Sequence, residues 1–165
     1  MDHGSSSSST TSGTTDAGRS GDVMFAQMMI PRHEQAVEMA DLALERPSSA
    51  EVTGLARKIK AAQGPEIATM QEWLREWRAP AAADGSEHMG HGGGMMSDAD
   101  MGRLGAAQGA AFDRMWLTMM IEHHEGAVVM AKDVLGTTTN PDVKAMAQAI
   151  VDGQTEEIGT MRALL

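Results

Sequence analysis

One segment of this chain occurs twice, at a constant distance along the sequence. Residues 22–40 align with residues 113–131, and His33 falls on His124 at an offset of 91 (124 − 33 = 91). A second segment, residues 63–70, aligns with residues 154–161 at the same offset and without a gap. Two separate blocks that share one offset indicate a duplicated unit, because chance similarity would not preserve the spacing between them.

Each unit carries the periodicity of amphipathic helices in two successive segments. A short break separates the two helical segments within each unit, at Pro47 in the first and at Pro141 in the second. Asn140 is a good N-cap before a proline at the first helical position. Short connections make paired helices antiparallel neighbours. The predicted fold class is therefore all-α, a four-helix bundle built from two tandem helical hairpins. The predicted helices cover residues 22–45, 49–78, 109–135 and 140–164, with a short additional helix over 97–105.

The predicted domain organisation follows from the repeat. Residues 1–21 contain a Ser/Thr-rich run from Ser5 to Thr15 and are predicted to be a disordered, flexible tether. Residues 22–165 form the bundle, in which repeat one (22–78) and repeat two (109–165) are joined by a Met/His/Gly-rich linker over 79–96.

Composition and charge exclude several function classes. With 13 Lys+Arg against 23 Asp+Glu the net charge is −10, and no basic run occurs, so a nucleic-acid partner is not expected. No run of 18 apolar residues exists to span a membrane. We expect a mature form that has lost its export signal, secreted or held in the cell envelope, with a lipid anchor on the tether as one means of attachment. No nucleophile elbow is present, and we expect no enzymatic activity.

Methionine is far more frequent than usual, with 16 Met beside six His and no Cys. Methionine is a flexible filler of hydrophobic cores, which accounts for many of these residues. Thioether and imidazole groups are also ligands for a soft cation such as Cu(I). Met119 and His123 are four residues apart, so they lie side by side on a helix, and Met120–His124 and Met29–His33 repeat this spacing.

Polar residues interrupt the apolar stripe of the second helix in each unit. Gln63 and Glu66 do so in the first, and Gln154 and Glu157 in the second. Buried amides and carboxylates are costly unless they are paired. We therefore predict a polar cluster inside the bundle in which these four side chains satisfy Arg32, His33, His123 and His124, including a buried ion pair of Glu66 or Glu157 with Arg32. Such a network could be purely architectural.

The linker offers a second set of soft ligands between the repeats. Glycines there would allow the chain to wrap a metal, and the alternative is a flexible linker whose ligands are accidental. The linker candidates are His88, Met89, His91, Met95 and Met96.

Residues 28–40 and 119–131 resemble the bacterial family called domain of unknown function 305, and the resemblance covers about 22–165. It implies a ferritin-like four-helix bundle, usually exported, and some members are implicated in copper binding through Met and His. The family pattern commonly carries a His pair in each unit. This chain has Arg32-His33 in unit one, which argues against a symmetric two-metal arrangement.

The leading hypothesis is an extracytoplasmic protein that sequesters or carries Cu(I), with the metal ion as partner and no protein partner identified. One alternative is a metal-free structural or interaction module. A di-iron carboxylate oxidase is disfavoured because Glu34 and Glu125 directly follow their His and fall on the polar face. The predicted bundle ligands are Met115, Met119, Met120, His123, His124 and Met130, joined by Met29 and His33 from unit one.

Overall fold

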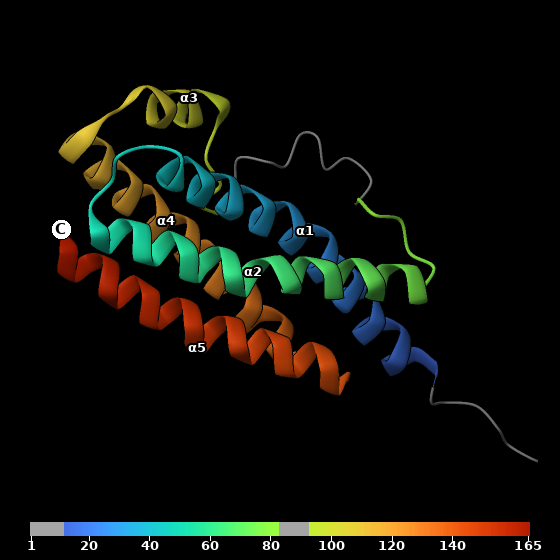
Figure 1. The fold of residues 1–165 in the computed structure, drawn as a ribbon. Coiled ribbons are helices and arrows are strands. Elements are labelled where there is room, and N and C mark those ends of the chain that lie inside the picture. Colours follow the sequence, from blue (N-terminus) through green and yellow to red (C-terminus); the bar gives the residue numbers. More distant parts are fainter. Residues whose placement is uncertain (1–11, 83–92) are drawn as a thin grey trace, which may run out of the picture.

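The computed structural model describes residues 12–82 and 93–165, and within these ranges every regular element is a helix. Two helical hairpins form the bundle, and a short helix lies across one end of it (Figure 1). The all-α prediction is confirmed. The helices are α1 (Ser12–Leu44), α2 (Ala50–Glu76), α3 (Asp98–Ala106), α4 (Gly109–Leu135) and α5 (Pro141–Leu164).

Local sequence signals set where three of the helices begin. The Asn140 side chain accepts hydrogen bonds from the first backbone amides of α5, and Pro141 occupies the first turn, as predicted. Ser97 and Asp100 form a capping box at the start of α3. Ser49 caps α2 by accepting from the Val52 amide at 3.2 Å.

The first helix begins ten residues earlier than the sequence predicted. Residues 12–21, assigned to the tether, belong to α1. No proline interrupts this segment, and two of its glycines lie beside the loop between α4 and α5 at a distance that would put a Cβ in ordinary van der Waals contact. A Cβ on Gly18 would lie 3.7 Å from the Thr137 carbonyl oxygen, and one on Gly21 would lie 3.5 Å from the Thr137 hydroxyl. Tertiary contact therefore extends the helix. The remainder of the predicted tether, residues 1–11, lies outside the described residues.

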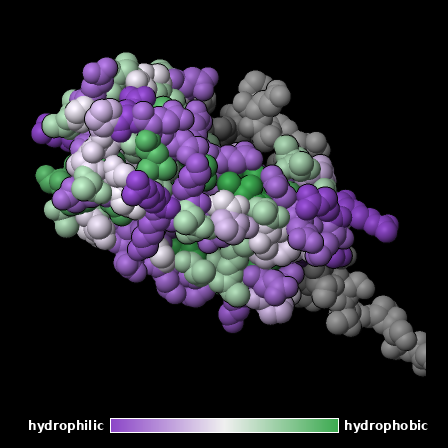
Figure 2. All heavy atoms as spheres, viewed as in Figure 1, coloured by the Kyte–Doolittle hydropathy of each residue, from purple (hydrophilic) through white to green (hydrophobic). Residues whose placement is uncertain are grey.

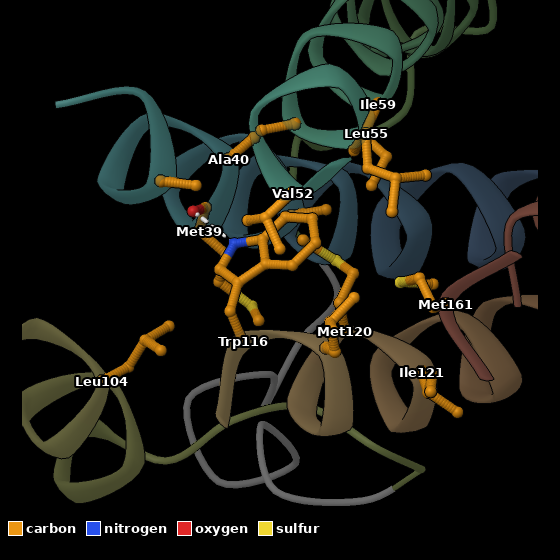
Figure 3. Close-up of a cluster of buried hydrophobic side chains, with 14 of the residues drawn as sticks. Met39, Ala40, Val52, Leu55, Ile59, Leu104, Trp116, Met120, Ile121 and Met161 are labelled. Atoms are coloured by element: carbon orange, nitrogen blue, oxygen red, sulfur yellow. Dashed lines mark hydrogen bonds between the residues drawn. The ribbon is translucent and has the colours of Figure 1, made fainter. Parts of the chain in front are cut away.

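The two hairpins are joined through α1 and α4, which run antiparallel. The Trp116 indole on α4 donates a 2.8 Å hydrogen bond to the Met39 carbonyl oxygen on α1 (Figure 3). Trp116 is the centre of one buried cluster, and Phe25, its equivalent 91 residues earlier, belongs to a second. The duplicated sequence thus produces two cores, one toward each end of the α1–α4 contact.

Each repeat also stabilises the inter-helix loop of the other. On α4, Asp113 accepts a 3.0 Å hydrogen bond from the Ser49 amide in the loop of hairpin one. On α1, its equivalent Asp22 is buried and bonds to the Thr138 side chain in the loop of hairpin two. The aspartate of each repeat therefore bonds to the loop of the opposite repeat.

The end of the linker is docked along α1 and α4, and we call residues 93–96 the strap. The Arg32 guanidinium donates to the Gly93 carbonyl oxygen at 2.7 Å. Gln35 binds both backbone groups of Met96, donating to its oxygen at 2.9 Å and accepting from its amide at 2.8 Å. Two polar side chains of α1 therefore fix the backbone of residues 93–96, the last part of the predicted linker.

Close backbone contact between the strap and α4 requires glycine. A Cβ at Gly126 would lie 1.7 Å from the Gly93 carbonyl oxygen. Gly94 has a φ of +86°, and a Cβ there would lie 2.3 Å from the Glu122 carbonyl oxygen. The strap can lie this close to α4 only because glycine occupies both segments where their backbones meet.

Hydrophilic residues dominate the face of the bundle seen in Figure 2, and apolar residues there form small, separated areas. Among the helices that the structure describes, none combines the length and apolar character needed to cross a membrane.

Substituting Gly126→Ala should destabilise the protein by about 1–3 kcal/mol, because the new methyl group would displace the strap. Gly153→Ala on α5 is the matched control, since nothing lies within 4 Å of a Cβ there. Alanine is the better helix former, so this control should be stabilised by about 0.5–1 kcal/mol. Urea denaturation measures both changes, and similar stabilisation by the two substitutions would contradict the close packing of the strap.

Candidate metal centre

Three buried histidines lie near one another inside the bundle, on α1 and α4. His33 comes from α1, and His123 and His124 come from α4. Each is at most 1% exposed. The ring centres of His123 and His124 are 6.4 Å apart. We call these three side chains the histidine cluster.

Two of the three imidazoles are held by carboxylates from the second helix of their own hairpin. His33 Nε2 lies 2.5 Å from Glu66 Oε2, and His124 Nε2 lies 2.8 Å from Glu157 Oε2. Both members of the second pair are 91 residues beyond those of the first, so the repeat builds the same pair twice. A carboxylate behind one ring nitrogen fixes the orientation and raises the basicity of the other nitrogen, as in many metal sites.

The opposite ring nitrogens of these histidines have no hydrogen-bond partner within the described part of the chain. His33 Nδ1 and His124 Nδ1 are both buried in this state, although buried polar atoms are normally paired. The amide oxygens of Gln63 and Gln154 are buried and unpartnered in the same way. The polar cluster predicted from sequence exists, but its amides do not satisfy the histidines as expected.

His123 differs from its neighbours because neither ring nitrogen finds a partner among the described residues. Burial holds the pKa of His123 well below its ordinary value of 6.5, and the nearby Arg32, His124 and His33 lower it further. The ring is therefore neutral at neutral pH. A neutral imidazole is the form that binds metal ions.

Arg32 takes a different role from the one predicted. Its guanidinium donates to the His123 carbonyl oxygen at 3.0 Å and to the Gly93 carbonyl oxygen at 2.7 Å. The carboxylates of Glu66 and Glu157, one of which was expected to pair with Arg32, bind His33 and His124 instead. Burial lowers the pKa of Arg32, but an arginine retains its charge across the ordinary pH range.

The predicted thioether ligands lie at several depths. Met29 and Met120 are completely buried, one on each repeat, whereas Met115, Met119 and Met130 are half-buried. Met96 packs in the same core cluster as Met120, and Met95 is half-buried in the strap. The linker candidates His88, Met89 and His91 lie outside the described residues.

Sequence reasoning missed contributors to this region. Met161 of α5 points into the same core as Met120 (Figure 3), and its recurrence as Met70 in the repeat was the available signal. Gln35 and Gly126, which hold the strap, occupy equivalent positions in the two repeats and were hidden because their identities differ.

Across residues 12–82 and 93–165, no three side chains of His, Cys, Asp or Glu are arranged together to hold a metal ion. The histidine cluster therefore does not form a complete nitrogen and oxygen site by itself. A cation bound here would need a thioether as a further ligand, and Met29 and Met120 supply sulfur at the helix turn before His33 and His124. Soft thioether and imidazole donors suit Cu(I) and Ag(I) rather than hard cations.

Fold and site together define a duplicated helical-hairpin protein with two equivalent histidine–glutamate contacts, one half-buried and one buried. Residues 22–165 match the family model described as Domain of unknown function (DUF305). The chain belongs to this family.

Solved structures resemble nearly the whole chain. A putative secreted DUF305 protein from Streptomyces coelicolor is 36% identical with a TM-score of 0.81, over 88% of this chain and 91% of that one. CopM in its Cu(II)-bound form is 35% identical with a TM-score of 0.77, over 87% of this chain and 94% of that one. CopM in its Cu(I)-bound form is 32% identical with a TM-score of 0.74, at the same coverage. An uncharacterized protein of Acanthamoeba polyphaga mimivirus is 36% identical over 53 residues, which span only 35% of that protein.

The lowered pKa of His123 predicts that acid destabilises the metal-free protein. The unfolded chain takes up a proton at this histidine near its ordinary pKa of 6.5, and the native protein does not, so stability falls as the pH drops below about 6.5. Between pH 7 and 5.5 this group should contribute a loss of about 1 kcal/mol.

Urea denaturation of the wild type and His123→Gln at both pH values isolates this contribution. The wild type should lose more stability than the variant over the same interval. Equal losses would show that His123 is protonated in the native protein.

Proposed function

We propose that this protein binds Cu(I) inside its bundle and serves as an exported copper-sequestering or copper-carrying protein. The ligands would come from the histidine cluster and from the thioethers that adjoin it. The single observation that carries the proposal is the set of buried imidazole nitrogens that lack hydrogen-bond partners among the described residues, at His33, His123 and His124.

Orphaned buried nitrogens are unfavourable in a metal-free protein, since each has lost its contacts with water without a replacement. A bound cation would satisfy them. Glu66 and Glu157 already bind the Nε2 atoms of His33 and His124. The carboxylates that would orient metal-ligating imidazoles are therefore in place. His123 is neutral without any deprotonation step.

The ligand types select the metal class. Thioethers favour Cu(I) over divalent ions, and the chain has no cysteine to compete for it. His123, His124, Met119 and Met120 would form the main ligand set on α4, and α1 would contribute Met29 and His33. The half-buried Met115 and Met130 and the linker residues would form outer positions for transfer. Thioether–imidazole coordination without thiolates suits release to a partner, so we propose a carrier and not an enzyme.

The relatives support this proposal at the level of the family. CopM, which covers 87% of this chain, is described in copper-bound and silver-bound forms. The Streptomyces coelicolor relative is described as a putative secreted protein, which supports an extracytoplasmic location.

A Cu(I) titration against a chromophoric chelator tests the bundle site. The parent protein should carry His88→Ala, Met89→Ala and His91→Ala, so that linker ligands do not contribute. We expect His123→Ala/His124→Ala to remove one equivalent of bound copper. Unchanged stoichiometry and affinity would eliminate the bundle site.

Glu157→Gln gives a milder test that preserves the shape of the side chain. Loss of the carboxylate behind His124 should weaken Cu(I) binding by about 10–100-fold. Glu156→Gln is the matched control, because Glu156 is the adjacent residue on α5 and its side chain is exposed. Equal effects of the two substitutions would argue against a role for the buried carboxylate in binding.

A metal-free structural module remains the second candidate, favoured by two observations. His33 and His124 are each bonded to a glutamate without any metal, and no three-residue His, Cys, Asp or Glu site exists among the described residues. In that case the histidine–glutamate pairs would serve only to fix the register of the helices. A folded wild-type protein that binds no Cu(I) would support this alternative.

A further inference from the structure

The two repeats are nearly identical where they face each other, and their few differences coincide with the strap. Residues 28–40 differ from residues 119–131 at four positions only, as read from the aligned sequence. Three of these four positions lie where the strap crosses the helices. The differing pairs are Pro31/Glu122, Arg32/His123, Gln35/Gly126 and Glu38/Val129.

The strap explains why the repeats cannot remain identical here. A protein with two repeats has one connection between them, so the strap lies on one side of the α1–α4 contact. On α1 it is held by side chains, through Arg32 to Gly93 and Gln35 to Met96. On α4 it is admitted by a missing side chain at Gly126. Equivalent positions have thus acquired complementary roles in holding one segment.

Arg32 and His123 are equivalent positions that also contact each other. Arg32 is 3% exposed, and its guanidinium lies 3.0 Å from the His123 carbonyl oxygen. The second contact, to Gly93, holds the guanidinium between the strap and α4. A fixed positive charge therefore stands beside the histidine cluster, at the place where repeat two has an imidazole.

The positive charge of Arg32 repels a cation, and repeat one also lacks the imidazole ligand that repeat two has at the equivalent position, His123. Two positive charges at short range in a protein interior repel strongly, and an arginine cannot escape the repulsion by losing its proton. The first repeat still has Met29, His33 and Glu66, equivalent to Met120, His124 and Glu157. It lacks only the counterpart of His123.

We propose that Arg32 limits the cation capacity of the bundle interior, because its guanidinium supplies the positive charge that a further metal ion would bring. This inference rests on the proposed copper site. It states that one residue, Arg32, determines how many metal ions the bundle interior binds. Arg32 thereby keeps the paired repeats from binding a pair of ions, while the same side chain clamps the strap.

Silver(I) is the probe, because it is soft like Cu(I) and is not oxidised by air. Native mass spectrometry counts the ions bound by the full chain, with His88→Ala, Met89→Ala and His91→Ala as the parent. Arg32→His should bind one more Ag(I) than the parent, whatever number the parent binds. An unchanged count in a variant with native circular dichroism overturns the inference.

Two further variants separate charge from shape. Arg32→Gln removes the charge without adding an imidazole, so Ag(I) affinity at the remaining site should rise on the order of tenfold or more. Arg32→Lys retains the charge and should match the parent. Equal affinities of the Gln and Lys variants overturn the inference, and these variants keep the test valid if Arg32→His fails to fold.

Gln35→Ala is the control for the strap. It removes both hydrogen bonds to Met96 and leaves the charge at Arg32 in place. The Ag(I) count should stay at the parent value, and an increase would assign the limit to the strap and overturn the role of charge. Failure of the copper proposal gives a different result. In that case the parent and the parent with His123→Ala/His124→Ala would bind Ag(I) equally.

Discussion

The contact between α1 and α4 is the constraint around which the rest of the molecule is arranged. It joins two copies of one hairpin in an antiparallel manner, so that equivalent residues face each other near its centre. Arg32 lies against His123 there, and the Trp116 indole bonds to the Met39 backbone nearer one end. Because the two helices carry nearly the same sequence, most side chains at the crossing are presented twice. The buried histidines, their glutamates and the two apolar clusters are all consequences of this duplication.

The interior that results contains many polar side chains. Eight buried residues are polar or charged within the described chain, and several of their atoms lack partners there. Such groups destabilise a fold unless something binds them. The pairs His33–Glu66 and His124–Glu157 offset part of this cost by joining the helices of each hairpin. The remaining unpartnered nitrogens are the feature that a purely architectural account leaves unexplained and that a bound soft cation would explain.

The sequence predicted the fold well because repetition and helical periodicity are local or fixed-offset signals. The cap at Asn140, the helix pairs and the burial of Gln63, Gln154 and Glu157 all followed from spacing. Partner choice did not follow, since a helical wheel places Glu66 and Glu157 in the interior without saying whether histidine or arginine receives them. The early start of α1 depends on contacts with Thr137, which is distant in sequence. The strap was missed for the same reason, because its clamps, Arg32 and Gln35, are about 60 residues away.

The exchange of aspartates between the repeats has a consequence for how the chain holds together. Asp113 secures the Ser49 turn of the opposite hairpin, and Asp22 reaches Thr138 in return. Each hairpin therefore depends on an aspartate of the other hairpin to hold its inter-helix loop. If the chain were severed between them, each half would be an incomplete folding unit that recovers its missing contacts only by associating with the other. We therefore expect the intact protein to unfold in a single cooperative transition, although it consists of two repeats.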